Sequence, residues 1–287
     1  MIAESRYLLT TLLIILFSSI SVAEEFDDEI STLSTLSLNN THDDYGNNDT
    51  NLFVDLELPS HQHIQFSYGE SVASDDLSNT RQIGIGISTD PYDTFSMGSE
   101  LSYWGESGLL ESHTLRTDLS INLESLSVTY SPQLSVVSIY LDVAPHQIDI
   151  YALGNEFSLN YFGISDYSFS ASYFINNFGN TSTNNIIKRR IEALDGRILS
   201  NRVQLLTSLE NNRIQLGMAR YVNWGSLGID WYYSNFAFVD SSSTNTIFTI
   251  NYNINKTIGL GLGYGLQTSS GDSSNSSFIN TTLYISW

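Results

Sequence analysis

Apolar and polar residues alternate with a period of two along most of this sequence, in segments separated by polar, turn-forming stretches. Between 82 and 88, isoleucines alternate with Gln, Gly and Ser, and between 258 and 266 every second residue is glycine. Successive side chains of a strand point to opposite faces, whereas a helix repeats every 3.6 residues. The pattern therefore predicts β-strands, each with one apolar and one polar face.

The last ten residues, 278–287, follow the same pattern and end on an aromatic residue. A tilted strand of about 9–11 residues crosses a bilayer core, where all its backbone groups must be paired, so a closed barrel is expected. This segment resembles the terminal strand of bacterial outer-membrane β-barrels. The resemblance implies that Tyr284 and Trp287 belong to the signal read by the outer-membrane assembly machinery.

The alternation predicts an all-β fold, a transmembrane antiparallel up-and-down barrel of about sixteen strands, with about fourteen as the alternative. The larger number requires a strand at 187–194, which could instead be a short helix in a loop. Near Val136 the apolar residues move from one set of alternate positions to the other, which predicts a bulge or a hidden turn at Pro132. A similar change occurs near Gly154. The candidate strands are 32–40, 51–58, 63–69, 81–88, 94–104, 113–123, 126–141, 147–162, 166–176, 187–194, 201–209, 213–222, 226–237, 245–255, 257–267 and 278–287.

The amino terminus has the features of an export signal. Arg6 precedes an apolar run at 7–20, and Ser21-Val22-Ala23 supplies small residues at a cleavage site. A membrane anchor is the alternative, but the run is short for a span and acidic residues follow it directly. The predicted organisation is a cleaved signal peptide at 1–23, an acidic periplasmic lead-in at 24–31 and a barrel at 32–287.

Alternation alone also suits a soluble barrel or sandwich, in which the apolar face points into a core. Here the polar face consists mostly of Gly, Ser, Asn, Thr and Gln, and only 15% of the chain is charged, against about a quarter in typical soluble domains. This favours an apolar face toward lipid and a polar face toward a water-filled lumen. The predicted lumen charges are Asp55, Glu57, Glu100, Arg116, Asp118, Glu156, Arg189, Arg190, Arg202 and Asp230.

Basic residues are concentrated in one region, 188–202, which includes Arg189, Arg190 and Arg202. Opposite the lumen acids, these side chains could create a transverse field at a constriction that sorts ions by charge. The alternative is a solvated loop that binds lipopolysaccharide phosphate.

Composition excludes several classes of function. A net charge of −20 argues against nucleic-acid binding. The absence of cysteine excludes disulfides, thiol catalysis and cysteine-ligated metals. His61 and His63 could share a face, but no third metal ligand lies near them in the sequence. No arrangement of nucleophile and base is evident, so neither an enzyme nor a cofactor is predicted.

The sequence therefore predicts an integral protein of the cell outer membrane. Its expected function is that of a passive, porin-like channel for small hydrophilic solutes or ions. A closed structural or adhesion barrel, acting through its surface loops, is the alternative. The expected partners are membrane lipid, lipopolysaccharide and the outer-membrane assembly machinery.

Overall fold

A computed structural model of the protein describes residues 34–58, 62–72, 79–92, 94–106, 110–140, 147–179, 209–237, 242–270 and 275–287. The predicted signal peptide 1–23, the lead-in 24–31 and the basic residues Arg189, Arg190 and Arg202 lie outside these ranges. Across the described part of the chain, no helix has the length and apolar character needed to cross a membrane.

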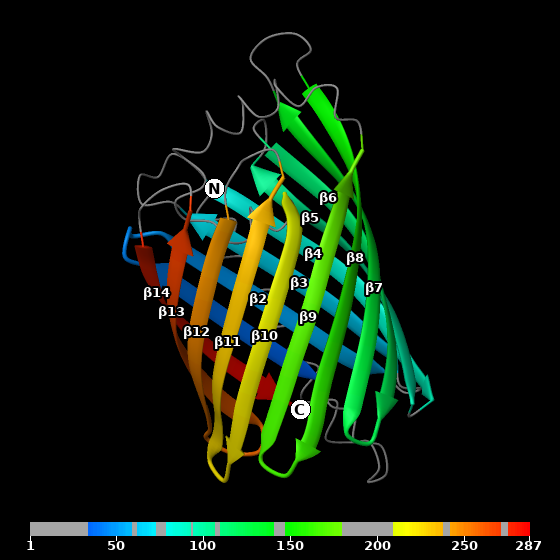
Figure 1. Ribbon diagram of the computed structural model, residues 1–287. Helices are drawn as coiled ribbons and strands as arrows, with labels where there is room; N and C mark the ends of the chain where they lie inside the picture. The colour runs from blue at the N-terminus through cyan, green and yellow to red at the C-terminus, as the bar shows by residue number, and fades with distance from the viewer. Residues whose placement is uncertain are drawn as a thin grey trace.

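The described strands form one closed antiparallel barrel in which each strand pairs with its neighbours in sequence and β1 pairs with β14 (Figure 1). The strands are β1 (Thr35–Asp43), β2 (Asn48–Leu58), β3 (Gln62–Val72), β4 (Asn79–Tyr92), β5 (Phe95–Glu106), β6 (Leu110–Leu123), β7 (Leu126–Tyr140), β8 (Gln147–Ile164), β9 (Tyr167–Phe178), β10 (Glu210–Val222), β11 (Gly225–Phe236), β12 (Ser242–Asn253), β13 (Ile258–Ser269) and β14 (Asn275–Ser286).

The barrel has 14 strands, so the main estimate of about sixteen is wrong and the alternative of fourteen is correct. The reason lies in the pairing of β9 with β10, which runs from Asn212 opposite Ile175 to Arg220 opposite Tyr167. Because these two strands are hydrogen-bonded to each other, no further strand separates them in the wall. The candidate strand 187–194 lies outside the described residues, as does 201–209 except for its last residue.

The long strands β7 and β8 pair without interruption, from Leu126 opposite Tyr161 to Tyr140 opposite Gln147. The predicted bulge or turn at Pro132 is therefore wrong. The apolar pattern changes because the inner face itself becomes apolar, with Val137, Ile139 and other side chains almost completely buried there. The shift of apolar residues from one set of alternate positions to both sets thus marks the point where the inner face of the wall becomes apolar.

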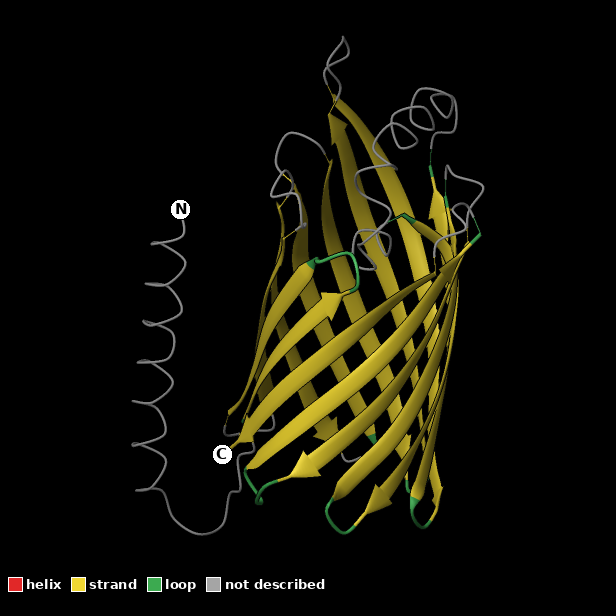
Figure 2. Ribbon diagram, turned by 90° about the vertical axis from the view of Figure 1, so that its left-hand side faces the viewer, coloured by secondary structure: helices red, strands yellow, loops and turns green. Residues whose placement is uncertain are grey.

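The two ends of the barrel differ. At one end the strands are joined by short turns at 124–125, 165–166 and 223–224, and β14 ends there. Short turns and the chain termini lie on the periplasmic side of outer-membrane barrels. At the other end the wall is uneven, since β1 has 9 residues while β8 has 18. Figure 2 shows the taller strands rising above the shorter ones.

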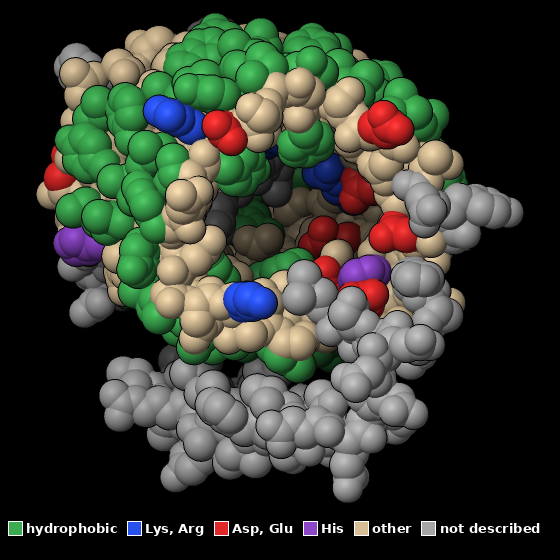
Figure 3. Space-filling view, turned by 90° about the horizontal axis from the view of Figure 1, so that it is seen from below, with side chains coloured by type: hydrophobic (Ala, Val, Ile, Leu, Met, Phe, Trp, Pro, Cys, Tyr) green, Lys and Arg blue, Asp and Glu red, His purple; other side chains and the backbone are tan. Residues whose placement is uncertain are grey.

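The apolar side chains on the outer face are exposed, which distinguishes a membrane barrel from a soluble one. Ile83, Leu119, Leu216 and Leu260 are all among the exposed large hydrophobic residues. Seen from below, apolar side chains surround a hollowed centre in which acidic and basic side chains are visible (Figure 3). The predicted orientation, with apolar groups toward lipid and polar groups toward the lumen, is therefore correct.

The glycines of β13 make room for large side chains on the inner face of β14. A Cβ atom at Gly259 would overlap the ring of Tyr284, and one at Gly265 would overlap the ring of Phe278. Each glycine lies directly opposite its aromatic residue across the strand pair. The aromatic rings therefore lie flat against the wall, which keeps this side of the lumen open.

Candidate functional site

A β-bulge at the start of β10 brings two opposite charges to the lumen. Residues three apart in a regular strand face opposite sides. The register of β10 against β11 shifts between Glu210 and Asn212, and the additional residue turns Glu210 to the same face as Arg213. Both side chains line the same cavities within the barrel.

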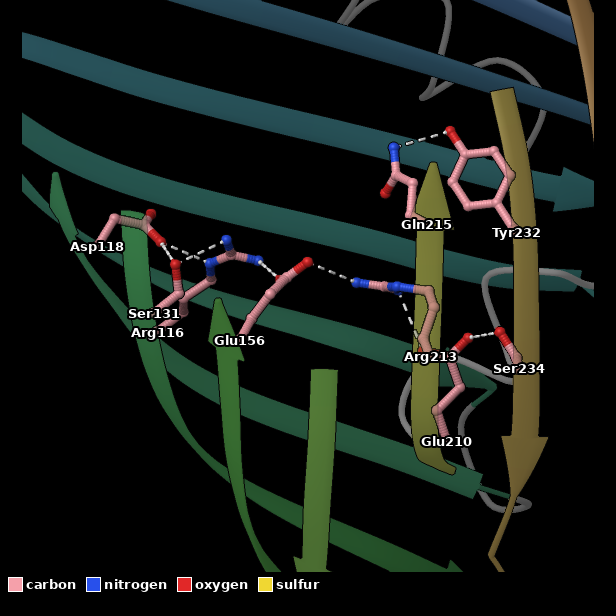
Figure 4. Close-up of polar contacts among 9 residues, drawn as sticks. All are labelled: Arg116, Asp118, Ser131, Glu156, Glu210, Arg213, Gln215, Tyr232 and Ser234. Carbon is pink, nitrogen blue, oxygen red and sulfur yellow. Dashed lines mark hydrogen bonds and ion pairs between the residues drawn. The ribbon is translucent and has the colours of Figure 1, made fainter. Parts of the chain in front are cut away.

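Five charged side chains of alternating sign form a ladder along the inner wall from β6 to β10 (Figure 4). Arg116 Nε lies 2.8 Å from Asp118 Oδ1, and Arg116 Nη1 lies 3.1 Å from Glu156 Oε2. Glu156 uses its other oxygen to bind Arg213 Nη2 at 3.3 Å. Arg213 Nη1 in turn lies 3.1 Å from Glu210 Oε2. The carboxylate of Glu156 therefore joins two ion pairs into one network.

Hydroxyl groups complete both ends of this ladder. Ser131 donates to Asp118 and accepts from Arg116 Nη2 at 3.1 Å. Ser234 donates to Glu210 Oε1 at 2.7 Å. The ladder is therefore fixed at its acidic ends by side chains of β7 and β11.

Burial makes this pairing necessary. The side chains of Glu156 and Glu210 are only 9% and 5% exposed. A buried carboxylate is strongly unfavourable unless it is paired and hydrogen-bonded. Arg213 supplies a charge to both carboxylates, and its guanidinium also lies 5.5 Å from the centre of the Phe174 ring. Arg213 is therefore the central cation of the ladder.

Two cavities meet at Arg213 and Glu210. The first has a volume of about 330 Å³ and lies against β4 to β7, β9 and β10, with Glu100 and Arg116 in its wall. The second has a volume of about 350 Å³ and is bounded by β10 to β14 together with β1 and β2. Arg213 and Glu210 thus belong to both walls, and the second wall adds Asp43, Asp49 and a larger number of amide side chains.

No protein-family model and no curated protein matches this sequence. Solved structures match it in fold. An anion-selective porin from Comamonas acidovorans aligns with a TM-score of 0.50 and 8% identity over 90% of this chain and 99% of that one. The NanC porin aligns with a TM-score of 0.49 and 10% identity over 87% of this chain and 98% of its own. A loop-deletion mutant of OmpT, an outer-membrane protein of Vibrio cholerae, aligns with a TM-score of 0.47 and 9% identity over 90% of this chain and 98% of that one.

The chain has the fold of a bacterial outer-membrane porin. Identity this low establishes the fold alone, and the function has to be argued from the lumen. The exposed apolar outer face of this porin-like barrel fits the hydrocarbon core of a membrane.

Within this porin-like barrel, three of the predicted lumen charges come together. Arg116, Asp118 and Glu156 are members of the ladder. Glu100 lies directly opposite Arg116 across β5 and β6. Asp230 faces inward from β11, and its carboxylate lies beside Gly217 of β10.

The remaining described charges of the prediction, Asp55 and Glu57, lie on β2 near the short-turn end of the porin-like barrel. Asp55 Oδ1 is 3.2 Å from His63 Nδ1, and Gln65 also donates to Asp55, at 3.3 Å. Glu57 is the register partner of His63. Acidic side chains of the lumen therefore extend to the short-turn end of the barrel. His61 lies outside the described residues.

Two members of the ladder, Arg213 and Glu210, were not predicted. The alternation of Ile214, Leu216 and Met218 as outward residues was a signal that could have placed Arg213 inside. Glu210 carried no such signal, because its orientation depends on the bulge.

Proposed function

We propose that the protein is a passive outer-membrane channel for small hydrophilic solutes, and that its lumen favours cations. One observation supports this most directly, namely the imbalance of charge on the inner face. Of the arginines that the structure describes, Arg116 and Arg213 face the lumen, and both are held in ion pairs. Inward carboxylates outnumber them, and Glu100 and Asp230 lie outside those ion pairs.

An excess of fixed negative charge in a narrow, low-dielectric passage concentrates cations and excludes anions. The full-length protein, purified and reconstituted in planar bilayers, should show discrete conductance steps. In a potassium chloride gradient, the reversal potential should have the sign of a cation-selective pore. Protein that inserts and gives no conductance steps would refute the channel.

A second candidate function, a closed structural or adhesion barrel, is favoured by a different observation. The inward apolar side chains of β7 and β8, among them Val137, Ile139 and Ile150, are almost completely buried. The lumen beside them is therefore not open water. If the barrel is closed, the purified protein should give no conductance in planar bilayers. Deleting the protein from cells should leave solute uptake unchanged.

Export and assembly are part of the same proposal. The signal peptide 1–23 would direct the chain across the inner membrane, and Tyr284 and Trp287 would serve in recognition by the assembly machinery. In the barrel, the backbone of Trp287 exchanges two hydrogen bonds with Ser34, at 2.9 and 3.0 Å. Replacing Trp287 with alanine should lower the amount of folded barrel in the outer membrane, measured by heat-modifiable electrophoresis. Lipid and lipopolysaccharide remain the proposed partners of the outer face.

A further inference from the structure

The second cavity has a lining chemistry that the channel proposal does not use. Amide side chains reach it from five strands, namely Asn39, Asn51, Asn245, Gln267 and Asn280. Each amide group can both donate and accept hydrogen bonds. A ligand that satisfies such a wall must also offer donors and acceptors side by side.

The charges in this wall disfavour an anion. Glu210 and Arg213 neutralise each other, while Asp43 and Asp49 add negative charge. Asp43 is engaged by the β1–β2 turn, since its carboxylate accepts from the backbone N–H groups of Tyr45 at 3.0 Å and Asn47 at 2.9 Å. The electrostatic environment therefore suits a neutral solute better than a carboxylate.

Among the buried polar atoms of this wall, an amide oxygen and a guanidinium nitrogen have no hydrogen-bond partner, and the two differ in kind. Asn245 is 8% exposed and its Oδ1 is an unpaired acceptor, while the Nε of Arg213 is an unpaired donor. An ammonium group offers no acceptor for Arg213 Nε, and a carboxylate offers no donor for Asn245 Oδ1. A hydroxyl group does both, so a ligand with several hydroxyls can satisfy both atoms.

An aromatic surface completes the site. The far end of the Phe278 ring lies over Gly265, so the other face of the ring is turned toward the cavity that it lines. Tyr232 also lines the cavity, and its hydroxyl accepts from Gln215 Nε2 at 3.3 Å. The C–H face of a pyranose ring packs on such an aromatic face, because the face carries negative charge density.

We propose that the second cavity binds an uncharged polyhydroxylated solute of the size of a mono- or disaccharide. Asn245, Arg213 and the neighbouring amides pair with its hydroxyls, and Phe278 packs against its ring. The volume of about 350 Å³ lies in the range of small-ligand sites, about 300–1,000 Å³. The inference rests on the proposed function, because the solute reaches this site through the lumen.

The test uses the full-length protein and two independent readouts. Sucrose is added to single channels in planar bilayers to measure blockade of the current, and it is titrated into the detergent-solubilised barrel by calorimetry. Glucuronate and a polyethylene glycol of similar mass are the comparison solutes. Sucrose should block and bind saturably, while glucuronate and the glycol should do neither.

Two variants examine the contacts, and each has a matched control. Asn245→Leu and Phe278→Leu should weaken sucrose binding about tenfold or more. Asn160→Leu on β8 and Phe53→Leu on β2 alter side chains of the same type that lie outside the lining of this cavity. These controls should bind sucrose like the parent protein.

The outcomes separate this inference from the channel itself. Conductance steps without sucrose binding overturn the sugar site and leave the channel intact. Sucrose binding without conductance overturns the channel and leaves the site. Equal binding of sucrose and glucuronate, or unchanged binding by both leucine variants, overturns the recognition argued above.

Discussion

The two halves of the lumen are built on different principles. From β6 to β10, charged side chains of alternating sign are joined to one another, and the carboxylates are nearly buried. From β12 to β14 and β1, the inner face carries glycines, amides and aromatic rings that lie flat against the wall. In the first half the charged groups pair with one another, whereas the wall of the second cavity includes the unpaired acceptor Asn245 Oδ1. The proposed binding site and the ion-pair ladder thus lie on different sides of one barrel.

The largest expected effect on stability comes from removing Arg213, the central cation of the ladder. Arg213→Met leaves the carboxylates of Glu156 and Glu210 without their shared cation. Removing one partner of a buried ion pair costs about 3–5 kcal/mol. Unfolding by urea in lipid vesicles measures the loss. The matched control is Arg220→Met, since Arg220 lies on the outer face over the ring of Tyr167 and should contribute about 0–1 kcal/mol. Equal losses in the two variants would contradict the central role of Arg213.

A smaller effect on stability is expected from crowding the side chains between β13 and β14. Gly265→Ala forces the Phe278 ring away from the wall, because the added Cβ overlaps it. Overpacking of this kind costs about 1–3 kcal/mol. Gly263→Ala is the control, since its Cβ would meet Asn280 at an ordinary 3.4 Å. The temperature at which the barrel loses its compact electrophoretic form should fall for Gly265→Ala and stay near the parent value for Gly263→Ala.

The smallest effect concerns the carboxylates outside the ladder. One charge acting over about 10 Å of water contributes roughly 0.4 kcal/mol. Removing the charge disfavours the cation and favours the anion by this amount, so Glu100→Gln and Asp230→Asn should each lower the potassium-to-chloride permeability ratio by about a factor of four. Reversal potentials in a salt gradient measure this ratio. Asp149→Asn removes a carboxylate from β8 that bonds to Ser138 on the outer face, and it should leave the ratio unchanged. A shift as large in this control would show that the lumen charges do not set selectivity.

The fold was predictable from the sequence because alternation reports directly on which face a side chain occupies. Strand boundaries from 51 to 123 and from 226 onward lie close to those predicted. The number of strands was not predictable, because the sequence alternates between 187 and 209 although β9 pairs directly with β10. Periodicity shows that a segment can form a strand, whereas the count depends on which edges pair.

The candidate site was predictable in part, for a similar reason. Arg116, Asp118 and Glu156 face inward by alternation alone, and the structure brings them together. Their partner Glu210 faces inward through a bulge, which reverses parity and has no mark in the sequence. The two cavities are lined by residues of strands far apart in the sequence, so they appear only in three dimensions.

The unequal strand lengths have a consequence for the cell surface. At about 3.3 Å per residue and a tilt of about 40°, the 18 residues of β8 rise roughly 45 Å, well beyond an apolar band of about 25 Å. The outer ends of β6 to β8 therefore stand in water, which explains why Tyr140 donates to Glu111 and Ser138 to Asp149 on their outward side. We expect this end of the wall to be accessible to antibodies and proteases from outside.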